Sequence, residues 1–249
     1  MHSPMISCIV PVFNGERYIS EALDSILAQT YRPLEILVVD DGSADGTGVV
    51  FAGYGAPVRY LPQPNAGQAA ARNLGLSAAR GEFVAFLDAD DLWHPEKLAR
   101  QMARFEARPD LDMCVTHIRN LCSPDLITKI GARYRDHPRL TQALPGYAAH
   151  TLLARRTLFQ MVGQFESALR HSNETEWFLR AAEREAVIEL LPDALVHRRF
   201  HRTNLSRLEA EANREEYLQL VKASLDRRRH VINKEVLESS RTTTPLHAS

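Results

Sequence analysis

The sequence Phe83-Val84-Ala85-Phe86-Leu87-Asp88-Ala89-Asp90-Asp91 runs an apolar stretch directly into a group of carboxylates. Residues 83–87 have the composition of a buried strand. Because alternate side chains of an extended chain point the same way, Asp88 and Asp90 converge while Ala89 faces away. Two convergent carboxylates are typical of a site for Mg²⁺ or Mn²⁺. An acidic turn that caps the following helix is the alternative interpretation.

Short apolar runs and helical patterns alternate on both sides of this stretch, between residues 5 and 118. This alternation is typical of βα units that build a mainly parallel central sheet flanked by helices, which is an α/β fold. Asn14 is placed to cap the first helix near its start. The expected strands are 5–12, 35–39, 58–61, 83–87 and 113–118, and the expected helices are 19–27, 69–79 and 95–105.

The pattern changes after residue 118. Residues 119–145 lack clear periodicity, which predicts a long irregular segment of the kind that often binds a ligand. The sequence then predicts a strand and helix over 148–162, a helix over 174–185, strands over 187–191 and 195–200, a charged helix over 207–238, and a disordered tail over 239–249.

Composition excludes several classes of protein. The chain has 249 residues, of which 45% are hydrophobic and 24% charged, so it is neither wholly disordered nor a fibrous rod. Thirty Lys and Arg against 31 Asp and Glu give a net charge of −1, which offers no overall positive field for nucleic acid. Any anionic ligand must therefore be bound by local groups.

The cysteines and the N-terminus predict a cytoplasmic protein. Cys8, Cys114 and Cys122 have no spacing typical of a disulfide framework or a zinc site. No basic segment precedes an apolar stretch at the N-terminus, and no uncharged apolar run approaches the ~18 residues of a membrane span. We therefore expect neither export nor a transmembrane segment.

Polar motifs follow three of the expected strands. They are Pro11-Val12-Phe13-Asn14, Asp40-Asp41-Gly42-Ser43 and Asp88-Ala89-Asp90. The carboxyl ends of parallel strands open toward the same crevice of a sheet, where ligands bind. The three motifs are therefore expected to meet.

Together with Asn65-Ala66-Gly67 and Ala71-Arg72-Asn73, these motifs resemble the family 2 glycosyltransferases of the GT-A fold, over roughly residues 5–105. The resemblance implies a GT-A domain over residues 1–206, followed by the helical extension and the tail. It also implies a nucleoside diphosphate sugar as donor, most often UDP-linked, a hydroxyl acceptor, and Mn²⁺ or Mg²⁺ as cofactor.

The resemblance assigns roles to individual residues. Asp41 is expected to accept a hydrogen bond from the nucleobase, and Asp40 to support the turn. Asp90 is expected to bind the metal directly, with Asp88 on the ribose or reaching the metal through water. The implied nucleotide-binding residues are Pro11, Phe13, Asn14, Asp41, Gly67, Arg72 and Asp88, and the implied metal ligands are Asp90, Asp88 and His201. Taken alone, Arg72 would be interpreted as a surface arginine of a helix.

An inverting transferase needs a base for the acceptor hydroxyl. The matching stretch is Asn173-Glu174-Thr175-Glu176-Trp177-Phe178-Leu179-Arg180, in which Asn173-Glu174 replaces the Glu-Asp pair usual in the family. Glu174 is the first candidate for the base and Glu176 the second. The two side chains lie about 200° apart at a helix start, so one of them is expected to face the crevice. Both could instead simply favour the helix N-terminus.

Three further features have two interpretations each. Arg199-Phe200-His201-Arg202-Thr203-Asn204-Leu205-Ser206 resembles the closing Arg-x-His-x-x-Asn-x-Ser element of the family, in which His201 would complete the metal site; a surface histidine is the alternative. Trp93 either packs under the next helix or touches a sugar. The basic cluster Arg227-Arg228-Arg229-His230 is either a solvated face or a dock for an anionic membrane.

The function expected from these observations is metal-dependent, inverting glycosyl transfer in the synthesis of a cell-surface glycan or related glycoconjugate. A catalytically degenerate module that binds sugar nucleotides is the alternative. A sugar nucleotidyltransferase is a further alternative, and it would show a Gly-rich basic loop after the first strand. A dehydrogenase is disfavoured because no Gly-x-Gly-x-x-Gly follows an expected strand. The last helix leaves open peripheral membrane association and a homodimer.

Overall fold

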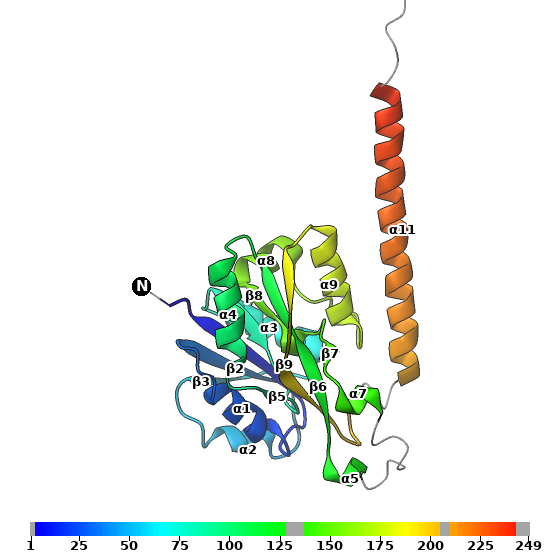
Figure 1. Ribbon diagram of the computed structural model, residues 1–249. Coiled ribbons are helices and arrows are strands. Elements are labelled where there is room, and N and C mark those ends of the chain that lie inside the picture. The colour runs from blue at the N-terminus through cyan, green and yellow to red at the C-terminus, as the bar shows by residue number, and fades with distance from the viewer. Residues whose placement is uncertain (1–2, 128–136, 205–209, 243–249) are drawn as a thin grey trace, which may run out of the picture.

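The computed structural model describes residues 3–127, 137–204 and 210–242. Within these residues a single sheet of nine strands lies between two groups of helices (Figure 1). The strands are β1 (Ile6–Val12), β2 (Leu34–Asp40), β3 (Val58–Pro62), β4 (Phe83–Phe86), β5 (Leu92–Trp93), β6 (Met113–Cys122), β7 (Leu144–Pro145), β8 (Leu153–Arg155) and β9 (Ile188–Phe200). The helices are α1 (Ile19–Leu27), α2 (Thr47–Phe51), α3 (Gln68–Ala78), α4 (Lys97–Ala107), α5 (Pro124–Ile127), α7 (Pro138–Thr141), the 3₁₀ turn η1 (Ala149–Thr151), α8 (Arg156–Val162), α9 (Asn173–Glu183) and α11 (Ala210–Thr242).

The sheet has a parallel half and a mixed half. Its order is β3-β2-β1-β4-β8-β6-β9-β5, with β7 paired to β6. The strands β3, β2, β1 and β4 are mutually parallel, as the βα pattern predicts. Beyond β4, the β8 strand is antiparallel to both of its neighbours, while β6 and β9 are parallel. The α/β fold is confirmed, and its parallel part carries the three sequence motifs.

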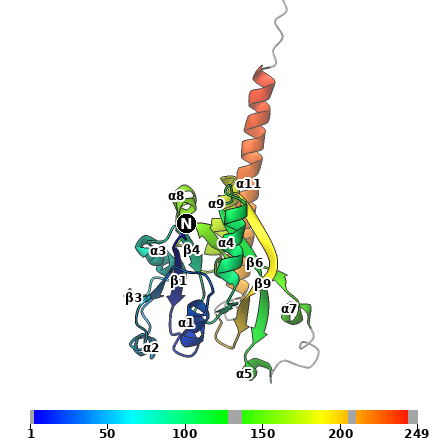
Figure 2. The same ribbon diagram turned by 60° about the vertical axis from the view of Figure 1, so that its left-hand side comes forward.

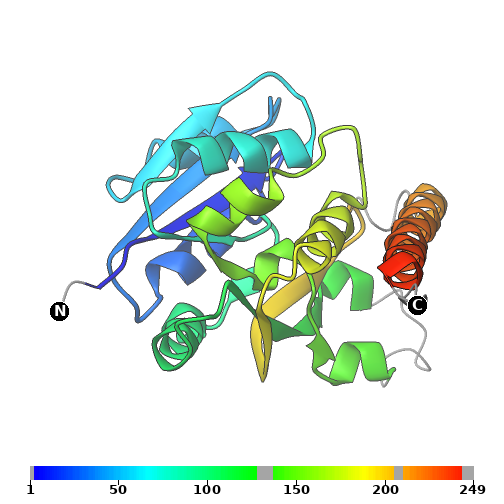
Figure 3. The same cartoon turned by 90° about the horizontal axis from the view of Figure 1, so that it is seen from above.

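Both faces of β1, β2 and β4 are buried. Along β1, Cys8 and Val10 belong to one core cluster and Ile9 to the other, as the alternation of side chains requires. The first cluster lies under α1 and α4, and the second under α3, α8 and α9, so helices cover both faces (Figure 3). Strands buried on both faces read as continuous apolar runs, which is why these strands are visible in the sequence.

Close packing of α3 against β1 depends on Gly75. A Cβ placed there would lie 2.4 Å from Cγ2 of Ile9, whose side chain is fully buried. The missing side chain therefore lets the helix approach the sheet. This approach places Gln68 and Arg72 of α3 beside the end of β4.

The cap expected at Asn14 is wrong. α1 begins at Ile19 after Tyr18, and no side chain caps it. The Oδ1 of Asn14 instead accepts a hydrogen bond from the Ala44 N–H, and the Asn14 N–H donates to Ser43. Asn14 adopts φ of 50°, a conformation that asparagine tolerates, and it joins the ends of β1 and β2.

The two strands expected over 187–191 and 195–200 are one strand, β9. The sequence favours a break because Pro192 lacks an N–H for the ladder. In the structure Leu191 pairs with Thr116 while Ala194 pairs with His117, so Pro192 and the next residue bulge out of the ladder. The bulge lets the strand continue past the proline.

The segment expected to be irregular over 119–145 contains regular structure. β6 continues to Cys122, and α5, α7 and β7 follow among the described residues. The terminal helix also runs further than expected, to Thr242, so residues 239–242 are helical. The expected domain boundary at 206 and the last residues of the tail lie outside the described residues.

The helix α11 starts beside α9 and then extends beyond the sheet (Figures 1 and 2). Ser224 donates a hydrogen bond to Glu183 of α9, and Arg227 of the basic cluster pairs with the same carboxylate. Near the start of α11, Glu216 accepts hydrogen bonds from the N–H groups of His171 and Ser172, just before α9. No helix among the described residues combines the length and the apolar character needed to cross a membrane. Association with a membrane or with a second copy stays a prediction.

Candidate active site

The strands β1, β2 and β4 end at the same edge of the sheet. Val12 pairs with Asp40 at the ends of β1 and β2, and β4 lies alongside β1 with Phe86 paired to Ile9. The polar motifs that follow these strands therefore meet, as expected. Phe13, directly after β1, has 54% of its surface exposed, which leaves its ring available to a ligand. Pro11 lies within β1 and is buried.

Asp40 and Asp41 both organise loops at this edge. Asp40 accepts hydrogen bonds from the Ser43 N–H and the Tyr60 hydroxyl, which agrees with a supporting role. Burial and this carboxylate together raise the pKa of Tyr60 to about 12. Asp41 is 4% exposed and its carboxylate accepts three hydrogen bonds from protein groups: the side chain of Gln63 and the N–H groups of Ala66 and Gly67. Its contact with a nucleobase stays a prediction.

Gly67 precedes α3 with φ of 91°, a conformation that L side chains rarely adopt. Its N–H is bound by Asp41, and open space surrounds the position where a Cβ would lie. The glycine therefore serves the backbone turn that leads into α3. The neighbouring Gln68 donates a hydrogen bond to Asp88 over 3.1 Å.

Arg72 is the centre of the site rather than a surface arginine. Its side chain is fully buried, and its guanidinium forms an ion pair with Asp88 at 2.9 Å and a second one with Glu174. It also donates a hydrogen bond to Oδ1 of Asn173 over 3.0 Å. One guanidinium thus joins the end of β4 to the start of α9, two segments far apart in the sequence.

An aromatic cluster fixes the position of the start of α9. Trp177 is fully buried, stacks on Phe159 at a centroid distance of 4.6 Å and donates a hydrogen bond to the Gly163 carbonyl. Asn173, at the position where the resemblance implies Glu, supplies a neutral oxygen to Arg72. Because that guanidinium already pairs with two carboxylates, a neutral group there avoids a third negative charge.

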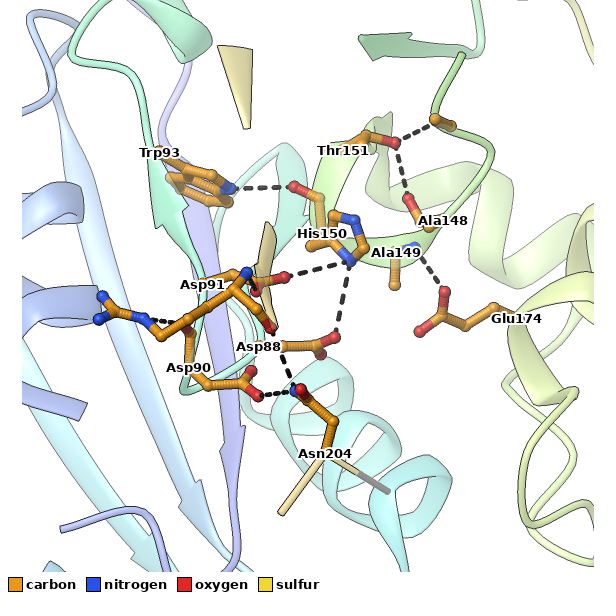
Figure 4. Close-up of polar contacts among 12 residues, drawn as sticks. Asp88, Asp90, Asp91, Trp93, Ala148, Ala149, His150, Thr151, Glu174 and Asn204 are labelled. Carbon is orange, nitrogen blue, oxygen red and sulfur yellow. Dashed lines mark hydrogen bonds and ion pairs between the residues drawn. The ribbon is translucent and has the colours of Figure 1, made fainter. Parts of the chain in front are cut away.

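Glu174 and Glu176 point to different surroundings. Glu174 accepts a hydrogen bond from the Ala149 N–H over 2.9 Å and pairs with Arg72, so it belongs to the site (Figure 4). Both oxygens of Glu176 accept hydrogen bonds from Arg180, one from Nε and one from Nη2. Nη1 of Arg180 donates to the Val162 carbonyl, and Nη2 also donates to the Gln164 carbonyl. The expected divergence of the two side chains is present, and Glu174 is the one beside Asp88 and Arg72.

Asp88 also belongs to a second cluster, which it forms with Asp91 and His150. The Nδ1 atom of His150 is 3.6 Å from Asp88 Oδ2 and 3.7 Å from Asp91 Oδ2 (Figure 4). These three residues form the group that could hold a metal ion among the described residues. Asp91 is 2% exposed and His150 is 5% exposed, so this part of the site is shielded from water.

The charges of this cluster are strongly perturbed. Burial alone would raise the pKa of Asp88, but Arg72 and His150 outweigh it and hold that pKa well below its usual range. Burial raises the pKa of Asp91 to about 8, with His150 opposing and the carboxylates of Asp90 and Asp88 adding to the effect. Burial alone would lower the pKa of His150, but the two carboxylates raise it. Such opposed shifts are typical of functional sites.

Asp90 lies with the segment that resembles the closing element of the family. Its Oδ2 is 2.7 Å from Nε2 of His201 and accepts a hydrogen bond from Asn204. Arg199 donates to the Asp90 carbonyl through Nε and to Asp91 through its N–H. The structure therefore brings Asp90 and His201 together, whereas it groups Asp88 with Asp91 and His150. Leu205 and Ser206 of this element lie outside the described residues.

The turn that carries His150 is held by three side chains that follow the acidic motif. Trp93 donates a hydrogen bond to the His150 carbonyl, Gln101 to the Thr151 carbonyl, and Lys97 to the Leu152 carbonyl, the last over 3.5 Å. Trp93 is 3% exposed, so it packs under α4 and contacts this turn rather than a sugar. Burial lowers the pKa of Lys97 to about 7.

Sequence reasoning missed Asp91 and His150 as members of the site. Asp91 directly follows the acidic motif and is visible there, but its burial is not. His150 lies in a segment without clear periodicity, and nothing near it in the sequence indicates a partner. The carboxylates and the imidazole together fit a divalent ion, since these are the ligands such ions take in proteins.

The sequence model of glycosyl transferase family 2 matches residues 7–163, from β1 to the end of α8. The match includes the acidic motif, Arg72 and the turn with His150. The chain belongs to glycosyl transferase family 2. The resemblance stated from the motifs is thereby confirmed.

Relatives of this family 2 chain carry similar names. An uncharacterized glycosyltransferase of Rickettsia prowazekii is 33% identical over 195 residues, which is 72% of this chain and 59% of that protein. The uncharacterized glycosyltransferase EpsJ of Bacillus subtilis is 29% identical over 234 residues, 87% of this chain and 67% of that protein. The chain spans about three fifths of the length of the Rickettsia relative.

Solved structures of glycosyltransferases share the GT-A fold with this chain. A structure of S. aureus TarS residues 1–349 in complex with UDP-GlcNAc has a TM-score of 0.65 at 24% identity, over 80% of this chain and 59% of that one. The mannosyltransferase PcManGT from Pyrobaculum calidifontis, in complex with GDP-Man and Mn²⁺, has a TM-score of 0.64 at 24% identity. The likeness covers 84% of this chain and 60% of the mannosyltransferase. The expected GT-A architecture is confirmed.

Proposed function

We propose that this family 2 chain transfers a sugar from a nucleoside diphosphate sugar to a hydroxyl group of an acceptor, with inversion at the anomeric carbon. The observation that carries the proposal is the pairing of Arg72 with both Asp88 and Glu174. Asp88 belongs to the expected donor site, and Glu174 is the expected base. The guanidinium that they share supports a donor site and a base that lie next to each other.

The proposed donor is UDP-linked, and Pro11, Phe13, Asn14 and Gly67 are proposed to line its nucleotide site. Support comes from the exposed ring of Phe13 at the carboxyl end of β1, which offers a flat face to a base. The S. aureus TarS structure, which shares the fold, holds UDP-GlcNAc. A hydroxyl of a cell-surface glycan or glycoconjugate is the proposed acceptor.

The proposed chemistry is a single displacement. The acceptor oxygen forms a bond to the anomeric carbon, the bond from that carbon to the diphosphate oxygen breaks, and Glu174 takes the acceptor proton. Hydrogen bonding to Ala149 and pairing with Arg72 hold this carboxylate in place. A positioned base supplies about 10²–10⁴-fold in rate.

A divalent ion, Mn²⁺ or Mg²⁺, is proposed as cofactor. When bound, it would neutralise negative charge that develops on the leaving diphosphate. Asp88 and Asp90 are carboxylates of the motif that follows β4, and each lies beside an imidazole, His150 for Asp88 and His201 for Asp90. Arg72 keeps Asp88 ionised, which favours binding of a cation.

The proposal is tested by calorimetric titration of UDP, GDP, dTDP and ADP with and without Mn²⁺. We expect one diphosphate to bind in a metal-dependent manner, and Asp90→Asn to lose that dependence. A panel of sugars on the preferred nucleotide then follows, with release of the diphosphate as the readout. If none of these diphosphates binds under either condition, the proposed function is wrong.

The role of Glu174 is tested with a matched pair of variants on the same helix. Glu174→Gln should lower turnover by about 10²-fold or more while nucleotide affinity stays within a few fold. Glu176→Gln, whose side chain serves Arg180, should keep most of the turnover. Nucleotide binding without turnover in the native protein would instead favour a degenerate binding module, an alternative suggested by the Asn173-Glu174 pair.

A further inference from the structure

The start of α9 takes its hydrogen-bond acceptor from another helix. Ser172 is the residue before α9, and its side chain makes no capping hydrogen bond. The N–H groups at the start of a helix have no partner within that helix, and a buried N–H without a partner costs free energy. Ser172 is 3% exposed and Asn173 is 1% exposed, so little water reaches this turn.

Glu216 of α11 supplies the acceptor. Its Oε1 accepts hydrogen bonds from the N–H of Ser172 over 2.7 Å and from the N–H of His171 over 3.2 Å. Hydrogen bonds from N–H groups to a carboxylate are stronger than those between neutral groups, and a negative charge is favourable at a helix N-terminus. Glu216 therefore does for α9 what a capping residue normally does from within the same segment.

A second contact holds α11 against the other end of α9. Ser224 donates a hydrogen bond to Glu183 over 2.9 Å, and Nη2 of Arg227 pairs with the same carboxylate at 3.0 Å. The contacts follow the same order along both helices, so the helices run parallel, and they lie side by side (Figures 1 and 3). The second contact therefore helps to keep Glu216 level with the start of α9.

The turn that Glu216 binds leads directly into the candidate active site. Asn173 and Glu174 follow Ser172, and both contact the guanidinium of Arg72. The carboxylate of Glu174 is held by Arg72 and by the Ala149 N–H, whereas its backbone is held by the turn before it. Without an acceptor, the N–H groups of that turn would have to reach water, and Glu174 would move with them.

We propose that Glu216 is a positioning residue for Glu174, and that the candidate active site is correctly arranged only while α11 is attached to α9. The inference deepens the proposed function and rests on it for the role of Glu174 as the base. A displacement of about 1 Å at a reacting group can cost about 10²-fold in rate. Because Arg72 and the Ala149 N–H still hold the carboxylate when Glu216 is removed, we expect a smaller loss of about 10-fold.

Amide hydrogen exchange measured by nuclear magnetic resonance tests the contact itself. In the native protein the N–H groups of His171 and Ser172 should be protected from exchange. In Glu216→Ala they should exchange at least about 10-fold faster, while the N–H groups of β1 keep their native rates. Glu215→Ala is the matched control, because it removes an exposed carboxylate from the same helix, and it should leave all of these rates unchanged.

Release of diphosphate from the preferred sugar nucleotide measures the consequence for turnover. Glu216→Ala should lower kcat about 10-fold, while KM for the donor and the stoichiometry of UDP binding with Mn²⁺ stay native. Glu216→Gln, which keeps an oxygen acceptor, should recover most of the loss. Glu216→Asp is one methylene shorter and should lie between the two, and it covers a failure of the alanine variant to fold.

A double variant separates positioning of the base from a general loss of structure. In a Glu174→Gln background, Glu216→Ala should cause no further loss of kcat, because no base remains to be positioned. A general structural effect would instead lower kcat by the same factor in both backgrounds.

Native kcat in Glu216→Ala, or an additive loss in the double variant, would overturn the proposal. Native exchange rates at His171 and Ser172 in Glu216→Ala would also overturn it. A native protein that releases no diphosphate from any sugar nucleotide would refute the proposed function and with it the role of Glu174. Turnover that persists undiminished in Glu216→Ala would refute this inference alone, so the two failures are distinguishable.

Discussion

Removal of the Arg72 guanidinium should destabilise the protein more than removal of an exposed arginine with the same kinds of partner. Arg72→Met keeps an apolar side chain of similar length but leaves Asp88 and Glu174 without their buried partner. Breaking a buried ion pair from one side costs about 3–5 kcal/mol. Because the two carboxylate side chains are 23% and 20% exposed, water reaches them in part. We therefore expect the lower end, about 3 kcal/mol, or a midpoint lower by about 6–12 °C.

Urea unfolding of native protein and variant measures this difference. Arg100→Met is the matched control, since Arg100 also pairs with two carboxylates, Glu96 and Asp193, but its side chain is 46% exposed. The control should leave the unfolding midpoint unchanged within error. In the double variant Arg72→Met/Glu174→Gln, part of the loss should be recovered because one unpaired charge is gone. A loss below about 1 kcal/mol for Arg72→Met, or strict additivity in the double variant, would refute the reasoning.

Three further outcomes are expected. Gly75→Ala should lower the free energy of unfolding by about 1–2 kcal/mol despite the better helix propensity of alanine, because its Cβ meets Ile9; Gly55→Ala, with nothing within 4 Å, is the control, and a stabilised Gly75 variant would contradict the packing. Gln101→Met should cost about 2–3 kcal/mol in urea unfolding, since the carbonyls of Cys114 and Thr151 lose their donor, and a neutral result would show that they find another. Burial lowers the pKa of Lys97 from 10.5 to about 7. In the pH window between these two values the unfolded chain binds the proton more tightly than the folded protein does, so the free energy of unfolding increases as the pH rises. Relative to native protein, Lys97→Met should therefore become less stable as the pH rises through the window, and a constant difference in urea unfolding across it would count against a buried, neutral Lys97.

Elements with a local signal were predicted well. The strands over 5–12, 35–39 and 58–61 match β1, β2 and β3 to within a residue or two. Of these, β1 and β2 are buried on both faces, and such strands are continuous apolar runs. The helices that cover them have apolar residues on one face. Where a local signal conflicts with a tertiary contact, the contact decided the outcome: Pro192 predicts a break, but pairing with β6 carries β9 past it on a bulge.

The residues of the candidate site also divide into those with a local sequence signal and those that depend on tertiary contacts. Asp41, Asp88 and Asp90 were visible because each follows a strand, and the parallel arrangement brings strand ends together. Asp91 and His150 were not assigned, since their role depends on burial and on a contact between residues 59 positions apart. The Asn14 cap failed because the side chain bonds to Ala44, at the end of another strand, instead of the following helix.

The sequence by itself determined the α/β order of elements, the edge of the sheet that carries the acidic motif, and the family to which the chain belongs. These follow from periodicity and from short motifs, which are properties of neighbouring residues. Only the tertiary structure decided that Arg72 is buried between Asp88 and Glu174, and that His150 lies against Asp88 and Asp91. Arg72 and Asn173 are 101 residues apart, and their hydrogen bond forms only when α3 and α9 pack on the same face of the sheet. Such a contact leaves no periodic trace in the sequence, because it depends on where whole elements come to rest.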